Sequence, residues 1–252
     1  MRMSVLVVVI MLMSACASHG QKADADSGAA AATTKPAAQA PVDRFEKFNR
    51  HMFSFNMKID RWVLKPVAKG YDKITPRFVK TGVSNFFGNL GEVDNILNDL
   101  LQWKWKQVGN DSGRLLVNTT IGIGGLFDVA RPMGMKKSDG EDFGQTLAVW
   151  GVKQGPFLVL PLLGPSTVRD GFALPVDWYA DPVTYIDHKT PRYALRALHL
   201  VDTRRSLLDA EKLISGDPYL FIRDAYLQRR EYLIKDGELD LDSGFDSGDE
   251  DF

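Results

Sequence analysis

Cysteine and histidine are scarce in this 252-residue sequence. Cys16 is its single cysteine, and the four histidines are His19, His51, His188 and His199. One cysteine cannot form a disulfide within the chain or a cysteine-based metal site, and no two histidines have the spacing of metal ligands. We therefore expect neither a metal ion nor a cofactor.

Long hydrophobic runs are also lacking. The apolar run at residues 4–13 follows Arg2 and is ten residues long, whereas about 20 apolar residues are needed to span a bilayer. A basic residue, a short apolar run and small residues before a cleavage site are typical of a secretory signal. Cys16 directly follows Ser14 and Ala15, which resembles a bacterial lipobox with lipid on the thiol. The alternative is an ordinary signal peptide with a cysteine nearby.

The lipobox divides the N-terminal part of the chain in two. Residues 1–15 are then a lipoprotein signal peptide, and residues 16–42 are the lipidated Cys16 with a disordered, alanine-rich linker. A buried methylene contributes about 0.8 kcal/mol, so several acyl chains such as palmitate anchor a protein almost permanently. Acylation of Cys16 also excludes thiol catalysis. Ala17 stands where an aspartate would act as an inner-membrane retention signal, which by resemblance to enteric sorting indicates the outer membrane.

The charges are distributed unevenly. Residues 236–252 hold eight acidic residues and no basic one, so we expect a disordered acidic tail. Residues 43–235, the expected folded domain, are left with a positive net charge. Such a domain suits a surface of anionic lipid, although charge also serves solubility.

Residues 43–66 show the clearest helical pattern. Apolar residues recur at spacings of three and four, which places them on one helix face. The stripe consists of Phe45, Phe48, Met52, Phe55, Ile59 and Trp62. Asp43 is a candidate N-cap, and Pro66 is expected to end the helix. The stripe faces either the protein core or, behind a lipid anchor, a bilayer.

Helical spacing continues after this segment. Residues 79–90 and 93–101 form two apolar repeats, and Gly88 and Gly91 predict a bend between them. A third segment is expected at residues 112–120. Between them, Trp103 and Trp105 alternate with lysines, as in a short strand or at the head-group level of a membrane.

Glycine gathers in the middle of the chain. Residues 121–127 and 140–171 are rich in glycine and include the apolar run 157–163. Neither a dinucleotide fingerprint nor a phosphate-binding loop is present. Apolar irregular backbone is tolerated in a membrane only where protein or a water-filled cavity covers it. The alternative is a loop-rich packing region.

More helices are expected toward the C-terminus. Ser166 is a candidate cap for a short helix that Pro175 ends, and the segments 190–201 and 203–214 are predicted helices. Asp217 followed by proline predicts the start of a last helix, which runs to about residue 235. The chain shows no nucleophile elbow and no paired carboxylates with a histidine, so we expect no catalytic residue.

Ordered motifs spread over residues 43–235 resemble one known family. They include Phe48-Asn49-Arg50 and the stretches 52–56, 84–90, 118–130, 142–147, 150–152, 155–171, 217–219 and 223–226. Together they resemble the VacJ/MlaA family of outer-membrane lipoproteins. The alanine-rich linker and the acidic tail lie outside the family pattern.

The resemblance implies a fold and a function. The fold is mainly α, a ring of amphipathic helices with a glycine-rich apolar hairpin or loop region, embedded in one leaflet. The function is non-enzymatic transport of phospholipid from the outer leaflet through an amphipathic channel, which maintains lipid asymmetry. The implied partners are the outer membrane, a trimeric porin, and a periplasmic carrier that feeds an inner-membrane ABC transporter. The implied location is the periplasmic side of the outer membrane of a Gram-negative bacterium. No nucleic acid is expected as a partner.

Two other functions remain open at this point: a structural envelope lipoprotein and an enzyme that modifies envelope lipid. The candidates for a channel wall or gate are Gly122, Gly124, Gly125, Gly144, Arg169 and Asp170. Arg169 and Asp170 are expected to form a structural ion pair at a helix start more readily than to contact a head group.

Overall fold

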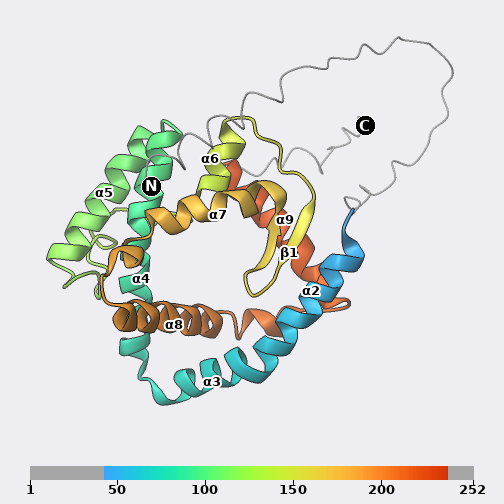
Figure 1. Ribbon diagram of the computed structural model, residues 1–252. Helices are drawn as coiled ribbons and strands as arrows, with labels where there is room; N and C mark the ends of the chain where they lie inside the picture. The colour runs from blue at the N-terminus through green and yellow to red at the C-terminus, as the bar shows by residue number, and fades with distance from the viewer. Residues whose placement is uncertain (1–42, 238–252) are drawn as a thin grey trace, which may run out of the picture. The chain divides into compact units, whose positions relative to one another are not determined.

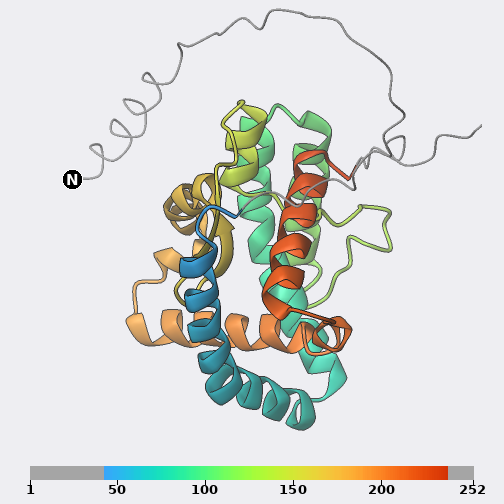
Figure 2. The ribbon, with the colours of Figure 1, turned by 90° about the vertical axis from the view of Figure 1, so that its right-hand side faces the viewer.

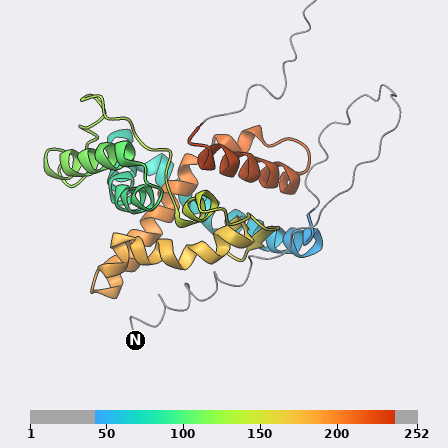
Figure 3. The same ribbon diagram turned by 90° about the horizontal axis from the view of Figure 1, so that it is seen from above.

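The computed structural model describes residues 43–237, which belong to one compact unit. Within this unit the helices are arranged as a ring, with a short β-hairpin on its inner side (Figure 1). Helix α9 lies toward one face of the ring and α7 toward the other (Figures 2 and 3). The expected mainly α fold with a hairpin is confirmed. The expected signal, the linker and most of the acidic tail lie outside the described residues.

The first side of the ring is one nearly continuous helical rod. It contains α2 (Glu46–Ile59), a π-helical turn at Asp60–Leu64, and α3 (Lys65–Ile74). The amide of Lys65 donates to the carbonyl of Asp60, five residues back. Pro66 therefore lies in the first turn of α3, where its missing N–H is tolerated. The prediction that Pro66 ends the helix is wrong, because the wide turn accommodates it.

The start of α2 also differs from the prediction. Phe45 is the N-cap and makes no side-chain cap bond. Asp43 lies two residues earlier, where its Oδ1 accepts the Phe45 amide at 3.0 Å and the Asn49 side chain at 3.0 Å. Asp43 thus orients the entry to the helix without being its cap.

Helix α4 (Arg77–Leu101) and α5 (Trp105–Thr120) pack against each other along the opposite side of the ring (Figure 1). The bend predicted at Gly88 and Gly91 is absent, because α4 is one helix of 25 residues. A glycine inside a helix costs only about 1 kcal/mol relative to alanine, which packing against α5 offsets. Helix α5 also begins seven residues earlier than predicted, at Trp105.

The hairpin is the element that holds the α2 side to the rest of the ring. Strands β1 (Phe157–Leu160) and β2 (Gly164–Thr167) pair antiparallel. The side-chain amide of Asn49 donates to the Phe157 carbonyl at 3.0 Å, and its oxygen accepts the Val159 amide at 2.9 Å. Seven residues on, Asn56 contacts Leu160 and Leu162 in the same manner. Two asparagines thus satisfy a strand edge that has no neighbouring strand.

The hairpin leads into α7 (Val168–Ala180), which packs on α6 (Phe143–Val149). Thr167, not the predicted Ser166, caps α7, and its hydroxyl accepts the Asp170 amide at 3.2 Å. The helix continues past Pro175, so the predicted end there is wrong. Proline removes one main-chain donor from a helix interior, and packing on α6 and the hairpin holds the helix together around it.

The chain closes the ring with α8 (Lys189–Ser206) and returns along α9 (Pro218–Ile234). Short 3₁₀ turns occupy Pro182–Tyr185 and Ala210–Leu213. A separate helix over 203–214 is therefore wrong. The start of the last helix is confirmed, since the Asp217 carboxylate accepts the Tyr219 amide at 2.9 Å.

Candidate functional site

The polarity of the ring is inverted relative to an ordinary globular domain. Among residues 43–237, buried polar and charged side chains outnumber buried hydrophobic ones, whereas Asp, Glu, Arg and Lys are seldom fully buried in soluble proteins. Helix α4 illustrates the inversion. Glu92, Asn95 and Asp99 recur at helical spacing and are buried, while Phe78 and Val79 on the same helix are exposed.

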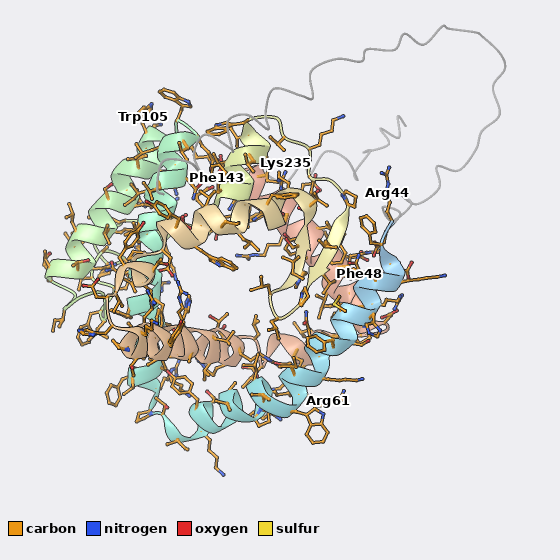
Figure 4. All side chains as sticks on the ribbon, viewed as in Figure 1. Arg44, Phe48, Arg61, Trp105, Phe143 and Lys235 are labelled. Carbon is orange, nitrogen blue, oxygen red and sulfur yellow. The ribbon has the colours of Figure 1, made fainter. Side chains whose placement is uncertain are left out.

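Large apolar side chains cover much of the outside. All five tryptophans of the sequence are exposed, from 46% for Trp150 to 79% for Trp62. Trp105 lies at the outer edge of the ring (Figure 4). Hydrophobic patches of this extent mark surfaces that contact a membrane or another protein.

The predicted stripe of α2 divides between the outside and the core. Phe45, Phe48, Phe55 and Trp62 are exposed, whereas Ile59 is only half-buried. Met52 packs instead against the hydrophobic cluster of Phe157, Val159 and Tyr219. The stripe therefore mainly faces outward, and its contact with a bilayer stays a prediction.

Inside the ring, an ion-pair network joins α6, α7 and α9. Arg230 on α9 donates through Nη2 to Asp170 Oδ1 at 3.0 Å and to Asp142 Oδ1 at 3.0 Å. Asp142 is the N-cap of α6 and also accepts the Gln145 amide at 2.9 Å. Three elements that are distant in sequence are thereby held at one point.

Asp170 is the centre of this network. It accepts the Tyr226 hydroxyl at 2.8 Å and pairs with Arg169 at 2.9 Å. Although burial opposes ionisation, Arg230 and these two neighbours hold the pKa of Asp170 below its ordinary value. The predicted ion pair of Arg169 and Asp170 at a helix start is present. It belongs to a larger structural network than the sequence indicated.

Gly144 fits tightly against the same network. A Cβ at this position would lie 2.6 Å from Asp170 Oδ1 and 2.8 Å from Arg230 Nη2. Any larger residue would therefore displace the ion pairs. Gly144, Arg169 and Asp170 are the three predicted site residues that the structure brings together.

Gly122, Gly124 and Gly125 lie elsewhere, in the turn after α5. A Cβ on Gly122 would lie 2.4 Å from the Asn118 carbonyl, and one on Gly125 would lie 2.5 Å from Asn89. Gly124 and Gly125 also have φ angles of 67° and 89°, which favour glycine. The six candidates for a channel wall or gate thus occupy two places, and that role stays a prediction.

A cavity of about 320 Å³ lies beside the Arg230 network. Its polar wall includes Asp94, Asp142, Asp170, Asp177 and Arg230, and its apolar wall includes Leu160, Leu163 and Leu174. A second cavity, of about 390 Å³, is lined by Leu97, Leu100, Leu101, Phe143 and Val176. Asp94 and Asp177 line both cavities. An acidic pair thus stands where a mixed polar and apolar cavity adjoins a largely apolar one.

These two carboxylates lie in an environment that disfavours their charge. Burial raises the pKa of Asp94 to about 7, and the neighbouring carboxylates of Asp177, Asp142 and Asp181 add to the shift. Burial also raises the pKa of Asp177 to about 6, although the Phe143 amide opposes this change. Both residues escaped prediction, because no sequence spacing connects α4, α6 and α7. The polar residues at helical spacing along α4 were the one feature of the sequence that could have indicated them.

Within residues 43–237, no cluster of His, Cys, Asp or Glu is arranged to hold a metal ion. Across the same residues, no helix combines the length and the hydropathy needed to cross a membrane. The site offers ion pairs, buried carboxylates and apolar walls, which suit the binding of an amphipathic molecule.

The comparisons with known proteins agree with this geometry. The family model described as "MlaA lipoprotein" matches residues 41–233. The intermembrane phospholipid transport system lipoprotein MlaA of Escherichia coli K12 is 32% identical over 251 residues, covering 95% of this chain and 91% of that protein. The protein of the same name from Haemophilus influenzae is 32% identical over 210 residues, covering 78% of this chain and 81% of the other.

A solved structure is also similar. It is reported as "Structural basis for maintenance of bacterial outer membrane lipid asymmetry", with a TM-score of 0.68 and 32% sequence identity. The match covers 77% of this chain and 99% of that one. The family model spans most of the sequence, and the helical ring has a close structural counterpart. The chain belongs to the MlaA lipoprotein family.

Proposed function

We propose that this chain transports phospholipid between membranes and maintains the lipid asymmetry of the outer membrane. In this proposal it takes misplaced phospholipid from the outer leaflet through an amphipathic channel inside the ring and changes no covalent bond. The observation that carries this proposal is the inverted polarity of the described ring, apolar outside and charged within. Its relatives named for intermembrane phospholipid transport support the same function.

The inverted polarity matches the two parts of a phospholipid and of its surroundings. An apolar outer surface is stable against acyl chains, whereas a charged interior must be shielded from them. The exposed side chains of α2 and of the π-helical turn after it, among them Phe55 and Trp62, hold the ring within a single leaflet. A lipid head group then crosses the leaflet next to the interior carboxylates and arginines.

The remaining parts of the chain complete this proposal. Residues 1–15 act as the signal peptide, and acylated Cys16 anchors the protein to the periplasmic side of the outer membrane through the linker 16–42. The folded domain at 43–235 stands beside a trimeric porin and passes lipid to a periplasmic carrier that feeds an inner-membrane ABC transporter.

The two competing functions predict different bound lipids. A structural lipoprotein would carry no phospholipid in its interior, and an enzyme would release altered lipid. An enzyme would need a nucleophile or an acid–base pair, for which Ser166, Arg169 and Asp170 are the candidates. Ser166 is 5% exposed and its hydroxyl donates to the Thr167 carbonyl, while Arg169 and Asp170 pair with each other. The side chains of all three are thus engaged in structural contacts.

Extraction of lipid from the purified full-length protein tests the proposal. The protein is isolated in mild detergent, mixed with phospholipid vesicles and separated from them, and its lipid is then analysed by mass spectrometry. We expect intact phospholipid bound to the protein. Absence of bound phospholipid would favour the structural function, and lysolipid or another product would favour the enzyme.

A further inference from the structure

Asp94 and Asp177 are carboxylates without a cation. Within residues 43–237 neither forms an ion pair; Asp94 accepts the Asn98 side chain at 3.2 Å and Asp177 accepts the Phe143 amide at 2.8 Å. Arg196 lines a smaller cavity together with Asp94, but it pairs with Asp181 at 3.6 Å. Neither carboxylate therefore has an ion-pair partner among the described residues, although Arg230 attracts Asp177 at longer range.

Arg230, which lines the same cavity, has a buried donor without an acceptor among the described residues. Arg230 is 7% exposed and lines the cavity of about 320 Å³. Its two terminal nitrogens contact Asp142 and Asp170, whereas its Nε donates to no described group. Arg230 is the only cationic side chain among the residues that line this cavity. A phosphate placed there would therefore lie beside its guanidinium.

The apolar neighbour of this cavity indicates what else the ligand carries. Leu97, Leu100 and Leu101 line the second cavity, which meets the first at Asp94 and Asp177. All three leucines are exposed by about 40%, as surfaces that receive acyl chains would be. A charged head group at the acidic pair would therefore have space for its hydrocarbon directly beside it.

We propose that the interior selects phospholipids with a primary ammonium head group, binding the ammonium at Asp94 and Asp177 and the phosphate at Arg230. This inference rests on the proposed function and names the preferred substrate. A primary ammonium supplies three donors and one positive charge to the two carboxylates. A glycerol head group supplies no positive charge, and a choline head group has no N–H to donate.

A divalent cation is the other ligand that acidic pairs attract. Calcium takes six to eight oxygen ligands, and within the described residues no group of three or more potential ligands is arranged for a metal. Compared with a calcium ion, a single ammonium group needs fewer oxygen ligands and therefore suits two carboxylates better. The apolar cavity beside them favours an ammonium that belongs to a lipid over one on a free head group.

The test is competition among lipids for the full-length protein in mild detergent. Vesicles contain equal parts of phosphatidylethanolamine, phosphatidylglycerol and phosphatidylcholine, and the bound lipids are quantified by mass spectrometry. We expect about fivefold enrichment of phosphatidylethanolamine over either other lipid, the ratio for about 1 kcal/mol. Asp94→Asn and Asp177→Asn should each lower the enrichment while total bound lipid remains. Each replacement keeps the side-chain shape and removes only charge.

Asp209→Asn is the matched control, because the Asp209 side chain is 93% exposed and pairs only with Lys212. It should leave the enrichment unchanged. Bound phospholipid without enrichment, or enrichment that survives both Asp94→Asn and Asp177→Asn, would overturn this inference alone. Absence of any bound phospholipid would overturn the proposed function itself. Displacement by soluble glycerophosphoethanolamine at the same concentration as the lipid would show that acyl chains are not recognised.

Discussion

At the scale of residues, buried amides and charges decide where the backbone goes. Asn49 and Asn56, two turns apart on α2, bind the free edge of β1 through paired hydrogen bonds. In the sequence they belong to the polar positions next to an apolar stripe, and nothing in their spacing indicates a strand as their partner. Their contacts span more than 100 residues, so the local pattern could not predict them.

Replacing Asn49 tests this arrangement. Asn49 is fully buried, so Asn49→Ala leaves the Val159 amide and the Phe157 carbonyl unpaired. We expect a loss of about 2–4 kcal/mol in the free energy of unfolding, measured by chemical denaturation. Asn56→Ala is the comparison. Asn56 lies nearer water, which replaces its bonds, and a loss of about 1 kcal/mol is expected. Equal stability of Asn49→Ala and wild type would contradict the role of Asn49.

The acidic pair predicts a dependence of stability on pH. The pKa of Asp94 is raised from 3.8 to about 7 by burial first and then by Asp177, Asp142 and Asp181. An acid with a raised pKa binds its proton more tightly in the folded state, so its contribution to stability falls as pH rises from about 4 to about 7. Asp94→Asn removes this loss. The variant should therefore be more stable than wild type at pH 8. At pH 5 its gain in stability over wild type should be smaller.

Thermal unfolding at the two pH values measures the effect. We expect Asp94→Asn to raise Tm by about 3–6 °C at pH 8, which corresponds to about 1–2 kcal/mol, and by less at pH 5. Asp209→Asn again serves as the control, since its side chain is exposed. If Asp94→Asn raises Tm equally at both pH values, ionisation of Asp94 is not what destabilises the wild-type protein.

At the scale of elements, the apolar repeats identified the helices, whereas several of their ends were misplaced. Apolar spacing predicted α2 and α4, and Asp217 followed by proline predicted the start of α9. The sequence predicts helix ends at Pro66 and Pro175 and a bend at Gly88, yet helices continue through all three. A proline inside a helix costs about 3 kcal/mol or more and a glycine about 1 kcal/mol, and packing between neighbouring helices outweighs these costs. Such tertiary packing is not visible in local sequence.

The outward face of α2 makes a prediction about membrane binding. Phe55 is 44% exposed, so Phe55→Asp should fold normally and place a charge against lipid. An aspartate in hydrocarbon costs about 2.5–3.5 kcal/mol, and we expect vesicle binding at least about tenfold weaker. The measurement is co-sedimentation with vesicles in a Cys16→Ser background, where the ring alone determines binding, with folding monitored by circular dichroism.

Ser54→Asp provides the matched control for this element. Ser54 is exposed on the polar side of the same helix, so the same charge there should not weaken binding. If Phe55→Asp and Ser54→Asp bind vesicles equally well, the stripe does not contact the bilayer. If both are weakened equally, charge rather than burial explains the loss.

At the scale of the whole molecule, the ring separates an apolar exterior from a charged interior. The sequence predicted a ring of helices through family resemblance. Three of its candidates for a channel wall or gate, Gly144, Arg169 and Asp170, meet in the interior network, and that role stays a prediction. The sequence did not reveal Asp94, Asp142, Asp177 and Arg230 as one cluster. They come from separate elements, and only the closed ring brings them together. The interior is therefore a property of the assembled fold.

The measurement that tests the central claim most directly is the amount of phospholipid in the outer leaflet of living cells. Cells lacking this protein are compared with cells complemented by the wild-type gene, using an amine-reactive reagent that cannot cross the outer membrane. We predict that surface-labelled phosphatidylethanolamine accumulates without the protein and returns to the normal level on complementation. Unchanged labelling in cells lacking the protein, with wild-type protein present in the outer membrane of the complemented cells, would contradict the account.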